Sequence, residues 1–434
     1  MRPLIACCLL LVSSAAAAGD DHVAALTATV QDKVLAWRRD LHQNPELGNR
    51  EFRTAKLVAA HLRALGLEVK TGIAHTGVVG ILKGGKPGPR IALRADMDAL
   101  PVTEQTGLPF ASKVTTNYNG ETVGVMHACG HDAHTAILMG VAQALASMRA
   151  DLPGEVMFIF QPAEEGAPAG ETGGAAQMLA EGLFNDFKPE AVFGLHMDSA
   201  SHAGDVGTRA GPMMAAADTF RIVVKGKQAH GGRPWQGVDP IVAAAAIVTN
   251  AQSIVSRRLN ITLQPAVLSF GIIKGGNREN IVPEQVELVG TIRSYDAAMR
   301  QQLFDELRRV AENTAAAYGA SVDAQIPSAE GYPILVNDPA LVERVNASLA
   351  RAAGAEHVKT ALLQTASEDF SEYARRVPSV FLRLGAIAPN VDLATAPPNH
   401  SPRFVIDEAS LPVGVRALLQ ISLDYLGADQ TVKP

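Results

Sequence analysis

The chain has 434 residues, of which 47% are hydrophobic and 5% aromatic, and its formal net charge is −6. This length is enough for two ordinary domains with buried cores. The negative charge and the absence of any run of clustered Lys and Arg argue against a nucleic-acid partner. The scarcity of aromatic residues beside 38 Gly and 25 Pro favours a helix-rich α/β enzyme over a β-sandwich.

The first 18 residues have the pattern of a secretory signal peptide. Arg2 gives a positive start, Leu4–Val12 an apolar centre, and 13–18 a series of small residues before a cleavage site near Ala18. The apolar run is too short to span a bilayer, and no later stretch is apolar enough to do so. We therefore expect a secreted or periplasmic protein that has no membrane partner and loses residues 1–18.

The following segment, up to about residue 212, alternates helices with short apolar strands. Apolar residues recur at helical spacing over 20–41 and 51–65, and again after Asp132, which stands where a helix N-cap is expected. Strands alternating with helices predict an α/β domain with a mostly parallel, wound sheet. The predicted strands are 78–82, 90–94, 155–161 and 191–196.

The pattern changes between about residues 213 and 327. A strand, a helix, two strands, a helix and a strand follow one another, and this βαββαβ order predicts a ferredoxin-like α+β domain. The chain then resumes its mixed α/β pattern and must return to the first domain. We expect a catalytic domain made of residues 19–212 and 328–434, with residues 213–327 inserted as a separate domain. The elements predicted in the insertion are 219–225, 239–255, 266–274, 281–293, 297–318 and 320–325.

Candidate metal ligands occur in four segments at strand or helix ends, where loops converge in α/β enzymes. The candidates are thiolate, imidazole and carboxylate groups, which are the ligand types of zinc. Five or six of them are too many for one tetrahedral ion, but they suit two ions that share a bridging ligand and activate a water. They are Cys129 and His131 before a helix, Glu164 and Glu165 after the strand 155–161, His196 at the end of the strand 191–196, and His400 near the end of the chain.

Glu164 and Glu165 are adjacent carboxylates that repel each other unless a cation lies nearby. On a surface such a pair carries little information. Here it follows a buried strand, and Pro162 and Gly166 shape the turn around it. One carboxylate can then bind metal while the other accepts a proton from the activated water and passes it to the leaving group.

Cys129 is the only cysteine left once Cys7 and Cys8 depart with the signal peptide, so it cannot form an intramolecular disulfide. It must be a buried spectator, a nucleophile or a metal ligand. A cysteine hydrolase would leave Glu164, His196 and His400 without a role, and the chain has no Gly-x-Ser-x-Gly motif for a serine hydrolase. A metal-binding or solute-binding protein without turnover is a further alternative, although Glu164 would have no task in it.

Seven segments of the chain, taken together, resemble the aminoacylase/carboxypeptidase family of metallopeptidases. Within that family the similarity is to the amidohydrolase branch, which includes hippurate hydrolases and the plant hydrolases of indole-acetyl amino acids. The resemblance spans roughly residues 30–419, with the motifs in the family's order. The segments are His42–Leu47, Arg94–Pro101, Cys129–Asp132, Pro162–Gly166, Gly194–His196, Ala229–His230 and Asn399–Pro402.

The resemblance implies a role for each matching residue. Glu164 would act as general base and then as general acid, and His230 would reach the active site of the partner subunit to stabilise the oxyanion. Asn280 would contact the substrate. Most of the wider family has His-x-Asp where this chain has Asp96-Met97-Asp98, so Asp96 as a ligand stays open and Asp98 is expected to support the ligands. The implied metal ligands are Cys129, His131, Glu165, His196 and His400.

The resemblance also implies the reaction and the partners. It indicates a two-metal amide hydrolase that acts on a small-molecule substrate, either an N-acyl amino acid or a dipeptide. The inserted domain is expected to form a homodimer. Two divalent ions are expected in each subunit, with Zn²⁺ first and Mn²⁺, Co²⁺ or Ni²⁺ tolerated by the same ligands. The acyl group and the amino acid are not specified.

Overall fold

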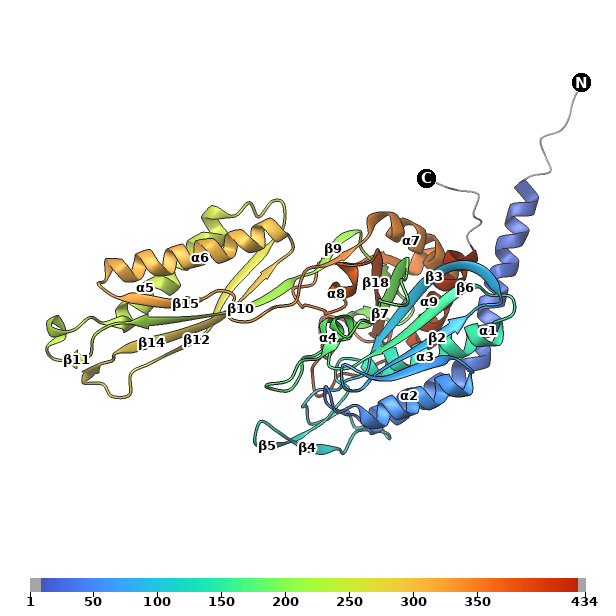
Figure 1. Cartoon of the computed structure of the whole chain (residues 1–434), viewed down its shortest axis with the longest axis horizontal. Coiled ribbons are helices and arrows are strands. Elements are labelled where there is room, and N and C mark those ends of the chain that lie inside the picture. Colours follow the sequence, from blue (N-terminus) through green and yellow to red (C-terminus); the bar gives the residue numbers. More distant parts are fainter. Residues whose placement is uncertain (1–8, 428–434) are drawn as a thin grey trace, which may run out of the picture. The chain divides into compact units, whose positions relative to one another are not determined.

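The computed structural model describes residues 9–427, so the first eight residues of the predicted signal peptide and residues 428–434 lie outside it. The chain divides into two compact units (Figure 1). Unit 1 consists of residues up to Gly211 together with Asn337–Ala361 and the chain from Tyr373 onward. Unit 2 consists of Pro212–Val336 and Leu362–Glu372.

Unit 1 is built around an eight-stranded sheet in the order β1-β2-β6-β3-β7-β18-β8-β17. The central pairs β6–β3, β3–β7 and β7–β18 are parallel, whereas β1 and β2 join one edge antiparallel. The predicted mostly parallel sheet is therefore confirmed. Its strands are β1 (Glu68–Ile73), β2 (Gly77–Lys83), β3 (Lys86–Asp96), β6 (Pro153–Gln161), β7 (Ala191–His202), β8 (Val206–Thr208), β17 (Val358–Thr360) and β18 (Ser379–Ile387).

Three helices of unit 1 pack against one another, namely α1 (Leu9–Gln43), α3 (His131–Ser147) and α9 (Ser410–Gly427). Helices α3 and α9 also contact β3. Gly140 allows α3 to approach α1 closely, because a Cβ there would lie 2.4 Å from Val34 Cγ2. Helix α1 is longer than the predicted 20–41. The remaining elements are α2 (Phe52–Ala64), α4 (Gly174–Ala180), α7 (Pro339–Ala353), the short α8 (Ser371–Ala374) at the unit boundary, and the hairpin of β4 (Thr115–Tyr118) and β5 (Glu121–Gly124).

Helix α3 begins differently from the prediction, in which Asp132 was its N-cap. The N-cap is Gly130, whose φ of 100° needs a residue without a Cβ, and Asp132 lies in the first turn. The buried Asp132 carboxylate instead lies 3.0 Å from Arg38 Nε and 2.8 Å from His42 Nδ1. Asp132 therefore ties α3 to α1, because a buried carboxylate needs charged partners to offset its desolvation.

Unit 2 contains a four-stranded antiparallel sheet in the order β12-β14-β10-β15 with two helices, which confirms the predicted βαββαβ insertion. Asp239 and Asp296 cap the helices by accepting hydrogen bonds from Ile241 N and Met299 N. Its core includes Phe220, Ile222, Ile247 and Leu288. The elements are β10 (Ala216–Lys225), β11 (Ala229–His230), α5 (Pro240–Ser253), a π-helical turn (Ile254–Arg258), β12 (Ala266–Gly275), β13 (Ile281–Val282), β14 (Gln285–Ser294), α6 (Ala297–Ala317) and β15 (Ser321–Gln325).

Unit 2 is larger than the predicted insertion of 213–327. Residues beyond 327 belong to it because their backbone pairs with the start of β10: Ala217 N donates to Tyr332 O, and Ala215 N donates to Gln364 O, both at 3.0 Å. The chain passes between the units in β9 (Gly211–Met214) and β16 (Leu335–Asn337).

Among residues 9–427, no helix is both long and apolar enough to cross a membrane.

Candidate metal centre

The five predicted metal ligands converge in unit 1, although they come from four separate parts of the chain. Cys129 Sγ lies 3.4 Å from His196 Nε2 and 3.2 Å from His400 Nε2. His400 Nε2 in turn lies 3.0 Å from Glu165 Oε1. His131, the first residue of α3, completes the group. Parallel strands β6 and β7 and the loops around them bring these side chains to one edge of the sheet, as expected for an α/β enzyme.

The ligand atoms form two overlapping triads. In one, Cys129, His131 and His196 place their ligand atoms within 4.8 Å of one another, and in the other Cys129, Glu165 and His400 do the same. Cys129 Sγ belongs to both triads. A thiolate shared by two sets of imidazole and carboxylate ligands has the donor chemistry of a bridged dinuclear centre for a borderline-soft cation such as zinc.

The orientation of the imidazole rings fits metal binding. His196 Nδ1 bonds to Met197 O at 2.7 Å and His131 Nδ1 bonds to Asp98 O at 2.8 Å. Because a carbonyl only accepts, these contacts place the proton on Nδ1 and leave on Nε2 of each neutral ring a lone pair that can bind a metal. Within the described chain, His131 Nε2 is buried without a hydrogen-bond partner, and a cation would satisfy it.

Electrostatics in the centre favour cations. Burial opposes the charged form of His131, but the Asp96 carboxylate, a hydrogen bond to Asp98 and the contact with Cys129 together outweigh burial and raise the pKa of His131 well above its usual range. Hydrogen bonds to Cys129 and Glu165 raise the pKa of His400 to about 10. Protons therefore accumulate where the anionic ligands gather, and metal binding is expected to displace them.

His134 and Asp96 form a pair that supports the centre. His134 Nδ1 contacts Asp96 Oδ1 at 2.6 Å, and His134 Nε2 accepts a hydrogen bond from Met197 N at 2.8 Å. Both ring nitrogens are thus engaged, and the other Asp96 oxygen bonds to Arg94 at 2.6 Å. This arrangement fixes β7 beside α3 and favours a supporting role for Asp96.

Glu164 and Glu165 lie on a tight turn after β6 whose backbone is held by carboxylates. Asp98 accepts hydrogen bonds from Glu164 N and Glu165 N, each at 3.0 Å. Ala163 N donates to Glu51 Oε1 at 2.9 Å. Ala163 has a φ of 52°, a left-handed conformation that costs an alanine about 1–2 kcal/mol. Glu164 is nearly buried, and its Oε2 lies 4.0 Å from His131 Nε2.

Asn399 holds the loop that presents His400. Its Nδ2 donates to Cys129 O at 3.1 Å and to Met197 O at 3.2 Å, while its Oδ1 accepts from Ser199 N at 3.2 Å. His400 N also donates to Ala128 O at 2.7 Å. Asn399 lies in the Asn399–Pro402 segment that carries the resemblance, but its contacts with Cys129 O and Met197 O could not be predicted from the sequence, because these backbone atoms are far away in the chain.

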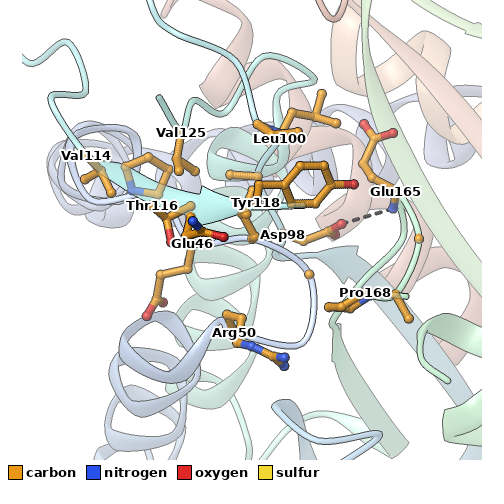
Figure 2. Close-up of a pocket in the computed structure, with 18 of the residues that line it drawn as sticks. Glu46, Arg50, Asp98, Leu100, Val114, Thr116, Tyr118, Val125, Glu165 and Pro168 are labelled. Atoms are coloured by element: carbon orange, nitrogen blue, oxygen red, sulfur yellow. Dashed lines mark hydrogen bonds between the residues drawn. The ribbon is translucent and has the colours of Figure 1, made fainter. Parts of the chain in front are cut away.

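A cavity of about 580 Å³ borders the centre at Asp98 and Glu165. Figure 2 shows Leu100, Val114 and Val125 above it and Arg50 and Pro168 below it, with Tyr118 between them. The lining combines apolar side chains such as Leu100 and Val114 with polar and charged ones such as Glu46 and Arg50. Sequence analysis did not foresee this cavity, because its lining comes from the loop after α1, the β4–β5 hairpin and the turn after β6.

His230 and Asn280 lie together in unit 2, where both are exposed. Strands β11 and β13 pair, and Gly231 N donates to Asn280 O at 2.7 Å. Gly232 N donates to His230 Nδ1 at 3.0 Å, so a neutral His230 ring keeps its proton on Nε2. His230 is thereby prepared to donate a hydrogen bond from Nε2.

The fold and the thiolate, imidazole and carboxylate centre define a metal-dependent hydrolase. Residues 92–424 match peptidase family M20/M25/M40. The thermostable carboxypeptidase 2 of Saccharolobus solfataricus is 39% identical over 91% of this chain and 96% of its own length. N-acetylcysteine deacetylase of Bacillus subtilis is 38% identical over 92% of this chain and 98% of its own length.

A solved structure supports the same assignment. The YXEP protein of Bacillus subtilis, described as a dinuclear metal-binding peptidase, aligns with a TM-score of 0.75 and 34% identity over 93% of this chain and 100% of its own. The chain belongs to the M20/M25/M40 peptidase family, as its resemblance to the amidohydrolase branch predicted, and it is a two-metal-dependent amide hydrolase.

Proposed function

We propose that this hydrolase cleaves the amide bond of N-acyl amino acids or dipeptides, with Glu164 as general base and then general acid. The observation that supports this most directly is the position of Glu164 beside the two triads, on a turn that also carries Glu165. A protein that only stored metal would not need this second, nearly buried carboxylate. Among the relatives are enzymes described as carboxypeptidase, N-acetylcysteine deacetylase and N-acyl-L-amino acid amidohydrolase.

One cation would be held by Cys129, His131 and His196 and the other by Cys129, Glu165 and His400. When bound, the cations supply a Lewis acid for the amide carbonyl and lower the pKa of a coordinated water. Zn²⁺ is our first assignment, although the same ligands accept Mn²⁺, Co²⁺ or Ni²⁺. Glu164 takes the proton of the attacking water and delivers it to the departing amine. Asp98 holds the Glu164–Glu165 backbone during this transfer.

The cavity beside Glu165 is proposed to bind the acyl group of the substrate. Its volume of about 580 Å³ is much larger than an acetyl group needs, and Leu100, Val114 and Val125 offer it apolar contacts. We therefore expect kcat/KM to be higher for N-benzoyl or medium-chain acyl amino acids than for the N-acetyl forms. A panel of substrates that share one amino acid and differ in the acyl group measures this preference.

We further propose a homodimer in which His230 of the partner subunit stabilises the oxyanion and Asn280 contacts the substrate. The support for a dimer is strand β12, which forms one edge of the unit 2 sheet. It exposes Ile272 and Ile273 there, and an apolar edge strand pairs readily with a second copy. Export through a cleaved signal peptide, residues 1–18, remains our proposal for the location of the enzyme.

The decisive experiment compares Glu164→Gln with Glu165→Gln after reconstitution with zinc. The first variant should keep two metal equivalents by elemental analysis while kcat falls by about 10²- to 10⁴-fold, since the proton acceptor is lost. The second should lose metal as well as activity. If Glu164→Gln hydrolyses N-acyl amino acids at the normal rate, the proposed mechanism is wrong.

A further inference from the structure

Glu51 is a buried carboxyl group that belongs to neither triad, yet it contacts the turn that carries Glu164 and Glu165. It is the N-cap residue of α2, and its side chain is fully buried. Its Oε1 accepts a hydrogen bond from Ala163 N at 2.9 Å. Its Oε2 bonds to the hydroxyl of Thr76, just before β2, at 2.5 Å. Glu51 is therefore held at both oxygens and joins α2 and the end of the β1–β2 turn to the loop after β6.

Three successive backbone N–H groups, those of residues 163, 164 and 165, all donate to carboxyl oxygens. Asp98 accepts two of them and Glu51 accepts the first. The first belongs to Ala163, the residue in the left-handed conformation, which persists only where the surroundings determine it. Without Glu51, Ala163 N would be a buried donor without a partner, and the turn would lose a restraint at its most strained residue.

The segment that precedes Glu51 packs tightly on the same turn. A Cβ on Gly48 would lie 2.9 Å from Gly166 O and 3.2 Å from the Ala163 Cα and Cβ atoms. Asn49 Nδ2 also donates to Thr172 O at 3.0 Å. Residues 48–51 thus follow the outside of the turn, and Glu51 supplies the hydrogen bond to Ala163 N at the end of this contact.

Burial, together with the nearby charge of Asp98, raises the pKa of Glu51 to about 8. A neutral carboxyl group can still accept the hydrogen bond from Ala163 N.

We propose that Glu51 is a positioning residue that sets the turn of Glu164 and Glu165 by accepting the Ala163 N–H. The inference rests on the roles proposed above for Glu164 and Glu165. It predicts that losing the acceptor harms both the proton transfer and the metal site that contains Glu165. It also predicts that an amide at position 51 suffices, because a glutamine oxygen accepts the same hydrogen bond.

The chain offers a matched control in Glu181. Its Oε2 accepts a hydrogen bond from Ala74 N at 2.9 Å, and Ala74 is also a left-handed alanine, with a φ of 48°. Glu181 is exposed, and its partner lies in the β1–β2 turn. Glu181→Ala therefore removes the same kind of contact without disturbing the turn after β6.

The experiment compares Glu51→Ala, Glu51→Gln and Glu181→Ala in the full chain. Zinc titration of the metal-free proteins by calorimetry gives the affinity of each site, and steady-state kinetics of the zinc-loaded proteins gives kcat and KM. Glu51→Ala should lower kcat by about 10²-fold with little change in KM, as misplacement of a catalytic group does. It should weaken one of the two zinc sites by about 10- to 100-fold. Glu51→Gln should recover both quantities to within about 3-fold, and Glu181→Ala should leave both unchanged.

Normal kcat and zinc affinities in Glu51→Ala would overturn the proposal, and so would a Glu51→Gln variant as impaired as Glu51→Ala. If circular dichroism shows that Glu51→Ala does not fold, Thr76→Val is tested in its place. This variant removes the hydrogen bond to Glu51 Oε2 while keeping the side-chain volume at position 76. That variant should lower kcat by about 3- to 10-fold, and an unchanged kcat and zinc affinity overturns the proposal. If the wild type hydrolyses none of the substrates, the proposed function fails, but the zinc titrations still test Glu51.

Discussion

Candidate functional residues of the two units differ in their exposure to solvent. Unit 1 buries Asp96, His131 and His134 completely around the metal centre, whereas unit 2 keeps His230 and Asn280 exposed on a small β-ribbon. Ligands that must hold cations need fixed positions and little competing water, so burial serves them. A histidine that must meet a substrate held elsewhere has to stay accessible. The contrast implies that metal binding and the oxyanion stabilisation proposed for His230 can be disturbed independently.

Burial of so many charged groups in unit 1 depends on pairing. Arg94 bonds to Asp96 at 2.6 Å, and Arg38 lies 3.0 Å from Asp132, with all four side chains almost completely buried. Each pair offsets the desolvation that an isolated charge would suffer. Unit 2 has a less buried pair in Asp218 and Arg300, which are joined by hydrogen bonds of 2.6 and 2.8 Å. This pair links α6 to the sheet.

The largest expected effect comes from removing the ligand shared by both triads. Cys129→Ser should weaken the binding of both cations by about 100-fold or more, because serine offers a poor ligand in place of a thiolate. Turnover should fall with the metal content. Elemental analysis after dialysis measures the loss. A Cys129→Ser protein that retains two tightly bound zinc ions contradicts the shared position of Cys129.

His230→Ala tests the role proposed for the exposed histidine of unit 2. It should retain both cations while kcat falls by about 10²- to 10³-fold, as expected for loss of an oxyanion donor. Metal content and kcat are measured on the same sample.

Mixing this variant with Glu164→Gln shows whether His230 acts across the dimer. Heterodimers would contain one active site with both Glu164 and His230, so refolding an equal mixture should restore about a quarter of wild-type activity. No recovery, with heterodimers shown by mass spectrometry, would contradict a role in the partner subunit.

Ile273→Lys should weaken the proposed dimer without directly changing the metal centre. A charged residue on the exposed edge strand β12 opposes pairing with a second copy and should weaken the dimer by about 10- to 100-fold. Both cations should remain bound, and kcat should fall toward that of His230→Ala as the protein is diluted. Analytical ultracentrifugation measures the dimer. Ser321→Lys in β15, at the opposite edge of the same sheet, is the control and should stay dimeric.

The smallest effect concerns the pH dependence of stability in unit 1. Between about pH 4.5 and 8, folded Glu51 keeps a proton that the unfolded chain loses. Its contribution to stability therefore declines as the pH rises through this range. Glu51→Gln removes this dependence. The difference between the Tm of Glu51→Gln and that of the wild type should therefore grow from pH 4.5 to pH 8 and stay constant above pH 8. Thermal unfolding of both metal-free proteins tests this, and a constant Tm difference contradicts the raised pKa.

Much of the fold followed from local patterns. Apolar periodicity predicted the strands that became β2, β3, β6 and β7, and the order of elements predicted the βαββαβ unit. Two local predictions were inexact for physical reasons. Gly130 replaces Asp132 as the N-cap of α3, since the buried charges of Arg38 and His42 hold the carboxylate. Unit 2 extends beyond residue 327 because later backbone pairs with the start of β10.

The sequence by itself determined which residues have the chemistry to bind metal and move a proton. Cys, His, Asp and Glu residues at predicted strand ends can be identified directly in the sequence, and the ends of parallel strands meet at one edge of the sheet in an α/β fold. Only the tertiary structure decided that Cys129 belongs to two triads, that Glu51 and Asn399 restrain the ligand loops through backbone atoms, and that a cavity adjoins Glu165. Hydrogen bonds to backbone groups leave no pattern in side-chain identity, and a cavity depends on how distant loops pack.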